Sequence, residues 1–160
     1  VGATTTVLYT HFDGKAGLLQ ALHDHALALC GDTLSEVPPS EVPLARLAWL
    51  ALAYRGFALA EPEAYALVAR ALAPNPQTLP ATRAYRELLE EVVRAAQAGW
   101  LIPMDPTELA TSLWSSVHGA VDLELSGYVT GDCDAQFRRH GLLLLRGVAA
   151  PDVPLPDLMG

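Results

Sequence analysis

The chain opens with a polar-to-aromatic stretch that reads Thr4-Thr5-Thr6-Val7-Leu8-Tyr9-Thr10-His11-Phe12-Asp13-Gly14-Lys15. The pattern predicts a short helix over residues 4–10, a tight break, and then the start of a long helix. This order resembles the second half of a helix-turn-helix motif, whose second helix enters the DNA major groove. We therefore expect the chain to begin inside a DNA-reading motif whose first half lies upstream of Val1.

Composition predicts that the rest of the chain is helical. Hydrophobic residues make up 51% of the 160 positions, and Ala and Leu, both strong helix formers, dominate them. The formal net charge of −8 argues against DNA contacts by the bulk of the chain, because phosphate contacts need Lys and Arg. Lys15, the only lysine, lies directly after the aromatic string. We therefore expect only the N-terminal piece to touch DNA, while the acidic body stays off the duplex.

Other features indicate a cytoplasmic protein that does not enter a membrane. Cys30 and Cys133 are too few for a disulfide framework and are expected to be reduced thiols. The most apolar stretch, Pro43 to Pro62, carries Arg46 and Arg55, which favours a buried core helix over a membrane span. The start of the chain has neither the basic leader nor the apolar run of a signal peptide.

Apolar spacing and capping residues predict six helices after the short one. Their expected ranges are 14–31, 43–60, 62 to about 74, 81–99, 105–127 and 132–147. Asp105-Pro106-Thr107-Glu108 is a strong signal for a helix start, and Gly31 and Pro74-Asn75-Pro76 are expected to be helix stops. Prolines predict a loop at residues 35–43 and an extended or disordered segment after Pro151.

The expected fold is therefore all-α, with the remnant of a helix-turn-helix joined to a six-helix bundle. Residues 1–31 would form the C-terminal half of a DNA-binding domain with its connecting helix. Residues 32–150 would form a sensing and dimerisation domain, and residues 151–160 a Pro-rich tail.

The opening stretch, read from Gly2 to Leu19, resembles the signature of the TetR family of bacterial repressors. Threonine hydroxyls and methyl groups suit base edges, whereas Tyr, His and Lys side chains suit phosphates. The resemblance implies that the threonines at 5, 6 and 10 face the bases, while the tyrosine, histidine and lysine hold the DNA backbone. The predicted DNA-binding residues are Thr4, Thr5, Thr6, Tyr9, Thr10, His11 and Lys15. The alternative is a surface turn that contains many threonines by chance.

A second informative stretch reads Leu113-Trp114-Ser115-Ser116-Val117-His118-Gly119-Ala120-Val121-Asp122-Leu123-Glu124-Leu125. It resembles the Trp-x-x-x-His-Gly stretch of a TetR regulatory-domain subgroup. The resemblance implies that this helix and the last one form a two-fold four-helix dimer interface, and a two-fold dimer matches a palindromic operator. The predicted interface residues are Gly119, Leu123, Phe137, Gly141, Leu144 and Leu145. The alternative is that both helices are internal core.

The resemblance also implies a small-molecule pocket inside the helical body. Aromatic rings and a few polar groups are what line such sites. The candidate residues are Trp49, Tyr54, Arg55, Phe57, Tyr65, Trp114 and His118. For each aromatic residue, ordinary core packing is the alternative. Arg46 and Arg55 project from opposite sides of a nearly all-apolar helix, so at least one of them must find a partner, reach water, or meet an anionic ligand.

The local sequence predicts no metal site and no catalytic site. His23 and His25 are two apart on a helix, about 200° around its axis, so they cannot chelate one ion together. Asp122 and Glu124 point apart for the same reason, and no Gly-rich phosphate loop or nucleophile signature is present. We therefore expect no cofactor.

Together these patterns predict a ligand-responsive transcriptional regulator rather than an enzyme. It would be a homodimeric repressor that a small-molecule effector releases from a palindromic operator. Two alternatives stay open: a helical small-molecule binding protein without a DNA role, and an enzyme whose residues come together only in the fold.

Overall fold

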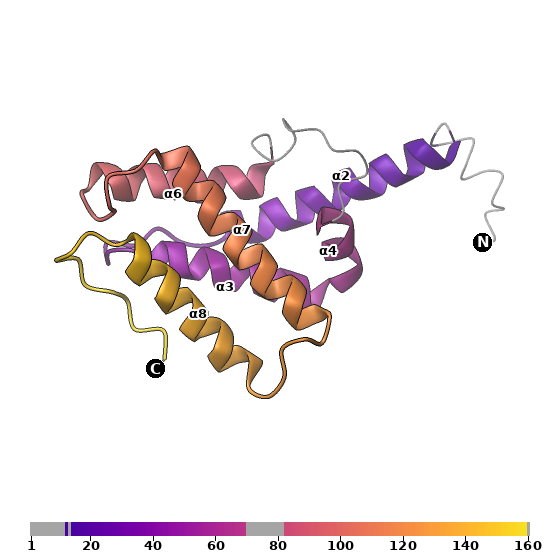
Figure 1. Ribbon diagram of the computed structural model, residues 1–160. Helices are drawn as coiled ribbons and strands as arrows, with labels where there is room; N and C mark the ends of the chain where they lie inside the picture. The colour runs from indigo at the N-terminus through magenta and orange to yellow at the C-terminus, as the bar shows by residue number, and fades with distance from the viewer. Residues whose placement is uncertain (1–11, 13, 70–81, 160) are drawn as a thin grey trace.

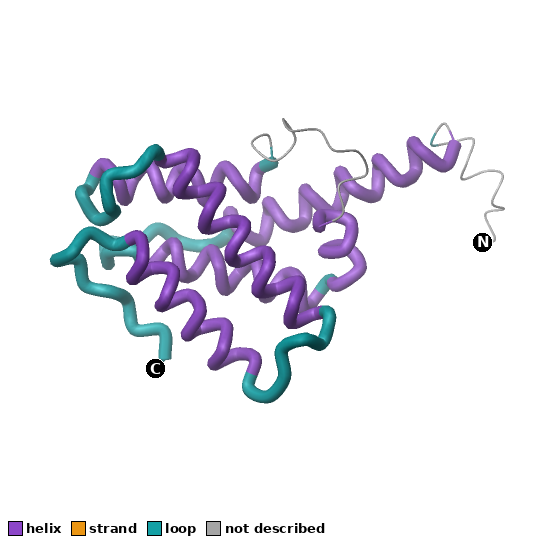
Figure 2. The backbone as a smooth tube through the Cα atoms, in the orientation of Figure 1, coloured by secondary structure: helices purple, strands orange, loops and turns teal. Residues whose placement is uncertain are grey.

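The computed structural model describes residue 12 and residues 14–69 and 82–159. Six α-helices make up most of this part of the chain, as Figure 1 and Figure 2 show. In chain order they are α2 Gly14–Ser35, α3 Ala45–Ala60, α4 Pro62–Ala69, α6 Arg83–Gln97, α7 Pro106–Leu125 and α8 Cys133–Val148. Within the described residues, the only β-structure is an isolated bridge between Leu101 and Ala149. The all-α fold predicted from composition and spacing is confirmed.

Three helices begin at capping signals that the sequence carries. The Asp105 carboxylate accepts hydrogen bonds from two backbone N–H groups in the first turn of α7, where Pro106 follows it. The Asp132 carboxylate accepts one such hydrogen bond at the start of α8, and the Thr82 hydroxyl accepts one at the start of α6. These side chains satisfy backbone donors that a helix start leaves unpaired, so the starts predicted near residues 105 and 132 are confirmed.

Two buried clusters hold the helices together. One cluster includes Tyr85 and Val92 of α6 and joins that helix to α3, α7 and α8. The other includes Tyr54 and Phe57 of α3 and joins that helix to α2, α4 and α7. Trp114 on α7 packs against both clusters. Among the described helices, none combines the length and apolarity that a membrane crossing requires.

Gly31 does not end the first long helix, and the stop predicted there is wrong, because α2 continues to Ser35. Gly31 is buried against α6, and a Cβ atom at this position would lie 2.8 Å from the Cβ of Arg83. Asp32 and Arg83 form an ion pair at the same place. The glycine therefore permits a close approach of two helices rather than terminating one.

Replacing Gly31 by alanine is expected to lower the free energy of unfolding by about 1–3 kcal/mol, because the added methyl group forces α2 and α6 apart. Gly56 provides the matched control, since it is exposed within α3 and a Cβ there would meet nothing within 4 Å. Gly56→Ala is expected to raise stability by about 0.5–1 kcal/mol, because alanine loses less backbone entropy in a helix. Urea titration measures both, and equal effects would contradict the packing role of Gly31.

The segment after α8 returns to the body. Leu158 is only 6% exposed, and the Arg138 guanidinium Nη1 donates a hydrogen bond to its carbonyl oxygen at 3.2 Å. The predicted Pro-rich tail is therefore irregular but packed against the core over its described residues. The short helix predicted over 4–10 and the stop predicted at Pro74-Asn75-Pro76 lie outside the described residues.

Candidate ligand-binding site

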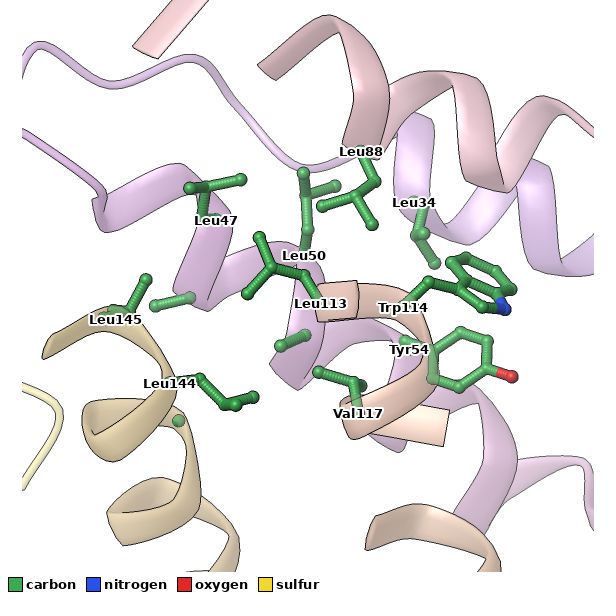
Figure 3. A pocket seen from close by; sticks show the side chains of 13 residues that line it. Leu34, Leu47, Leu50, Tyr54, Leu88, Leu113, Trp114, Val117, Leu144 and Leu145 are labelled. Carbon is green, nitrogen blue, oxygen red and sulfur yellow. The ribbon is translucent and has the colours of Figure 1, made fainter. Parts of the chain in front are cut away.

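An apolar cavity of about 50 Å³ lies between α3, α7 and α8, with one leucine each from α2 and α6 (Figure 3). Its lining residues are Leu34, Leu47, Ala48, Leu50, Ala51, Tyr54, Leu88, Leu113, Trp114, Val117, Gly141, Leu144 and Leu145. None of these residues is charged, and only Tyr54 and Trp114 carry a polar side-chain atom. The cavity therefore offers apolar contact area and very few hydrogen bonds.

An aromatic and polar cluster adjoins the cavity. The rings of Tyr54 and Trp114, which both line the cavity, have centroids 5.0 Å apart. The Tyr54 hydroxyl oxygen lies 2.7 Å from His118 Nδ1, within hydrogen-bond distance. The Tyr65 hydroxyl donates to the His118 carbonyl oxygen at 3.4 Å, and its ring meets that of Tyr54 edge-on. Four of the pocket residues predicted from the sequence therefore lie together beside the cavity, namely Tyr54, Tyr65, Trp114 and His118.

Burial shifts several pKa values in this cluster. It raises the pKa of Tyr54 above its ordinary value and raises the pKa of Tyr65 and of the Cys30 thiol to about 12 each. Burial also lowers the pKa of His118, because it disfavours the imidazolium, while the nearby Asp122 carboxylate acts in the opposite direction. At neutral pH the phenols and the thiol therefore stay protonated, and the imidazole is neutral.

The pKa of His118 predicts a loss of stability in mild acid. Because this pKa lies below its ordinary value of 6.5 in the folded protein, the unfolded chain takes up the proton more readily. The contribution to stability is fully present above pH 6.5 and is lost as the pH falls toward the folded pKa, by at most about 1.4 kcal/mol per pH unit. Urea unfolding of the wild type and of His118→Asn at pH values of about 7.5 and 5 measures it. A stability difference between the two proteins that stays constant with pH would contradict the assignment.

Five of the seven predicted pocket residues do not line the cavity: Tyr65 and His118, which only adjoin it, and Trp49, Phe57 and Arg55, which lie elsewhere. Trp49 is 38% exposed at the surface, and Phe57 packs within the second buried cluster. Arg55 donates to the Glu124 carboxylate through Nε at 2.7 Å and Nη2 at 2.8 Å, and to Asp134 through Nη1 at 3.0 Å. Of the three outcomes that the sequence left open for the arginines of this helix, Arg55 has the first, because it is paired within the protein, and both of its partners are acidic.

Most residues that line the cavity are aliphatic, and the sequence did not predict them as pocket residues. Leu34 at the C-terminal end of α2 and Leu88 on α6 reach the cavity from helices that were not considered part of it. No local signal distinguishes these leucines from the many others in the chain, because only the packing of helices distant in sequence brings them together.

A second, more open groove of about 400 Å³ lies between α7 and α8. It contains half of the predicted dimer interface, namely Gly119, Leu123 and Phe137. Leu123 is 49% exposed, whereas Phe137 is largely covered by its own chain. The other three predicted interface residues line the apolar cavity instead: Gly141, Leu144 and Leu145.

The predicted DNA-binding residues Thr4, Thr5, Thr6, Tyr9, Thr10 and His11 lie outside the described residues. Lys15 is described, and it is exposed in the first turn of α2. Figure 1 shows the N-terminal half of α2 extending beyond the other helices. Over the described part of the chain, no three His, Cys, Asp or Glu side chains are grouped so that they could hold a metal ion.

Comparison with known proteins places this architecture in a family. A family model described as Tetracyclin repressor-like, C-terminal domain, matches residues 47–142, which include all of α4, α6 and α7 and most of α3 and α8. The chain belongs to the TetR family. The family to which the two sequence stretches pointed is therefore confirmed, and residues 47–142 correspond to the regulatory domain of a TetR-type protein.

A solved structure resembles this TetR-family chain over most of its length. The structure is that of a protein with unknown function from Rhodococcus sp. RHA1, with 26% sequence identity and a TM-score of 0.78. The similarity covers 93% of this chain and 80% of that one. No curated protein matches the chain. Family membership points to a regulator rather than an enzyme.

Proposed function

We propose that this TetR-family protein is a ligand-responsive, DNA-binding transcriptional regulator, and that it acts as a repressor which a small-molecule effector releases from a palindromic operator. One observation carries the proposal. A single helix, α2, connects a residue that lines the apolar cavity, Leu34, with the exposed Lys15 beside the predicted DNA-reading stretch. A ligand in the cavity and a DNA operator would therefore act on the same rigid element.

The coupling follows from how α2 is held. Near its C-terminal end, Gly31 and Asp32 pack closely against Arg83 of α6, while Leu34 reaches the cavity. An effector that favours a different position of Leu34 favours a different orientation of α2. It thereby changes the placement of the DNA-reading residues, which is a population shift between two packings.

The proposed dimer would use α7 and α8. Both helices carry large exposed apolar side chains, Leu123 at 49% and Leu143 at 71% exposure, and the groove between α7 and α8 contains small residues that permit close approach, such as Gly119. An isologous contact through this face gives a two-fold dimer, and two DNA-reading ends related by that axis suit a palindrome.

Gel retardation with a palindromic site near the protein's own gene tests the DNA-binding role. The protein with its intact helix-turn-helix is expected to retard this fragment, and Tyr9→Ala is expected to weaken binding about tenfold, or more, through loss of a backbone contact. Tyr128→Ala is the matched control, because Tyr128 is 81% exposed in the loop between α7 and α8. Undiminished binding by Tyr9→Ala would refute the assigned recognition helix, and absence of retardation would favour a binding protein without a DNA role.

Sedimentation analysis tests the dimer. Leu123→Glu is expected to convert the dimer to monomers, because it places charge on an apolar contact. Leu59→Glu is the control, since Leu59 has a similar exposure of 44% but lies on α3. A monomeric wild type, or a dimer unaffected by Leu123→Glu, would exclude this interface.

A further inference from the structure

We propose that the effector is an uncharged, largely hydrocarbon molecule, about the size of one aromatic ring, which binds in the apolar cavity between α3, α7 and α8. The proposal names the ligand class of the regulator proposed above, and its biological meaning rests on that function. Two properties of the cavity carry it, its lining and the charges around it, while its size requires that one wall move.

The lining selects against ligands that need hydrogen bonds. Aliphatic side chains supply most of it, and the backbone around it is helical, so its N–H and C=O groups pair with each other. The Tyr54 hydroxyl is already bonded to His118, and Figure 3 shows it pointing away from the leucines on the opposite side of the cavity. A strongly polar ligand would give up hydrogen bonds to water without replacing them.

The surroundings of the cavity exclude charged ligands even more strongly than polar ones. Arg46 and Arg55 are the two cationic residues of α3, and neither lines the cavity. Arg46 pairs with Glu87 at 2.8 Å, and Arg55 pairs with Glu124 at 2.7 Å. An ionised carboxylate or amine in the cavity would therefore be buried without a counter-ion, which the apolar surroundings disfavour.

A ring fits this cavity only if one wall moves. The cavity volume of about 50 Å³ is roughly a third of the ~150 Å³ of an apolar protein cavity that holds benzene. Leu144 is the side chain best placed to yield, because it is only partly buried, whereas lining leucines such as Leu34 and Leu50 are 2% exposed. Figure 3 shows Leu144 reaching from α8 toward the middle of the cavity. Its outward rotation would make room for a ring against Tyr54 and Trp114.

Toluene and benzoate test the ligand class, because they share a planar ring and differ in charge. Toluene is expected to raise the midpoint of thermal unfolding, and benzoate at the same concentration to leave it unchanged. Benzoate that binds as tightly as toluene, or a wild type that binds neither compound, would overturn the proposal.

Matched variants test whether toluene binds in this cavity. Leu144→Ala removes part of the moving wall and is expected to tighten toluene binding about tenfold in calorimetry. Leu59→Ala, on α3 at a position that is 44% exposed and outside the cavity lining, is expected to leave the affinity unchanged. Ala51→Leu fills the cavity from α3 and is expected to weaken binding. If Leu144→Ala does not fold, Val117→Ala enlarges the same cavity from α7. Equal affinities in the enlarged and filled variants would reject this cavity.

The operator assay separates this proposal from the proposed function. Toluene binding by a protein that retards no operator upholds the cavity chemistry and rejects the regulator. Release from the operator by charged compounds, but not by neutral aromatic ones, upholds the regulator and rejects the effector class.

Discussion

Tyr85→Ala is expected to lower the free energy of unfolding by about 3–5 kcal/mol, as large aromatic truncations in a core do. Tyr85 on α6 is 1% exposed, and its ring meets that of Trp114 edge-on with centroids 5.9 Å apart. Its hydroxyl oxygen lies 2.8 Å from the Thr111 hydroxyl oxygen on α7. Since domains are stable by only about 5–15 kcal/mol, the variant should unfold at a much lower urea concentration.

Two controls divide this loss into its parts. Tyr85→Phe keeps the ring and removes only the hydroxyl, so it is expected to cost about 1 kcal/mol. Tyr128→Ala removes the same side chain from a site that is 81% exposed and is expected to cost about 0.5 kcal/mol or less. A loss below about 1 kcal/mol for Tyr85→Ala would contradict the packing of α6 on α7 described here.

Arg55→Ala is expected to lower the free energy of unfolding by about 3 kcal/mol, because it leaves a largely buried carboxylate without its partner. The side chains of Arg55 and Glu124 are each 12% exposed, and the guanidinium also lies 5.3 Å from the ring centroid of Phe137. The ion pair joins α3 to α7, and the bond to Asp134 extends it to α8. Urea unfolding at neutral pH measures the loss.

Arg138→Ala is the matched control for this ion pair. Arg138 pairs with Asp134 four residues away on the surface of α8, donates one hydrogen bond to the Leu158 carbonyl oxygen, and has a side chain that is 35% exposed, so its loss is expected to cost about 1 kcal/mol. Arg55→Lys is expected to fall between the two, because an ammonium cannot bind the carboxylate with two parallel N–H groups. Equal losses for Arg55→Ala and Arg138→Ala would show that burial adds nothing to the pair.

Helix starts were predictable because their causes are local. Asp105 and Pro106 act on the backbone within the next turn, so the residues that set the start are neighbours in the chain. Gly31 was wrongly predicted to end its helix, because the reason for a glycine at this position is not local. Arg83, which lies on another helix, occupies the space where a side chain would be. A glycine that ends a helix and a glycine that admits a neighbouring helix look alike in a sequence.

The candidate site was predictable where spacing alone determines the face of a helix. Trp114 and His118 are four apart on α7, so they share a face and both contact Tyr54. The helix α3 is apolar almost all round, and its sequence therefore does not say which residues face inward. Tyr54 lines the cavity, while Trp49 on the same helix is exposed.

Under the proposed mechanism, α2 would tilt about the close contact of Gly31 with Arg83, which lies much nearer its C-terminal end than its N-terminal end. With the rise of about 1.5 Å per residue of an α-helix, Leu34 lies about 4–5 Å along the axis from Gly31, and Gly14 lies about 25 Å from Gly31 in the other direction. A tilt that displaces Leu34 by about 1 Å thus carries Gly14 through about 5 Å, more than the ~3.4 Å between successive base pairs. In the proposed regulator, a displacement smaller than a methyl group at the cavity would therefore move the N-terminal end of α2 by more than one step of the duplex.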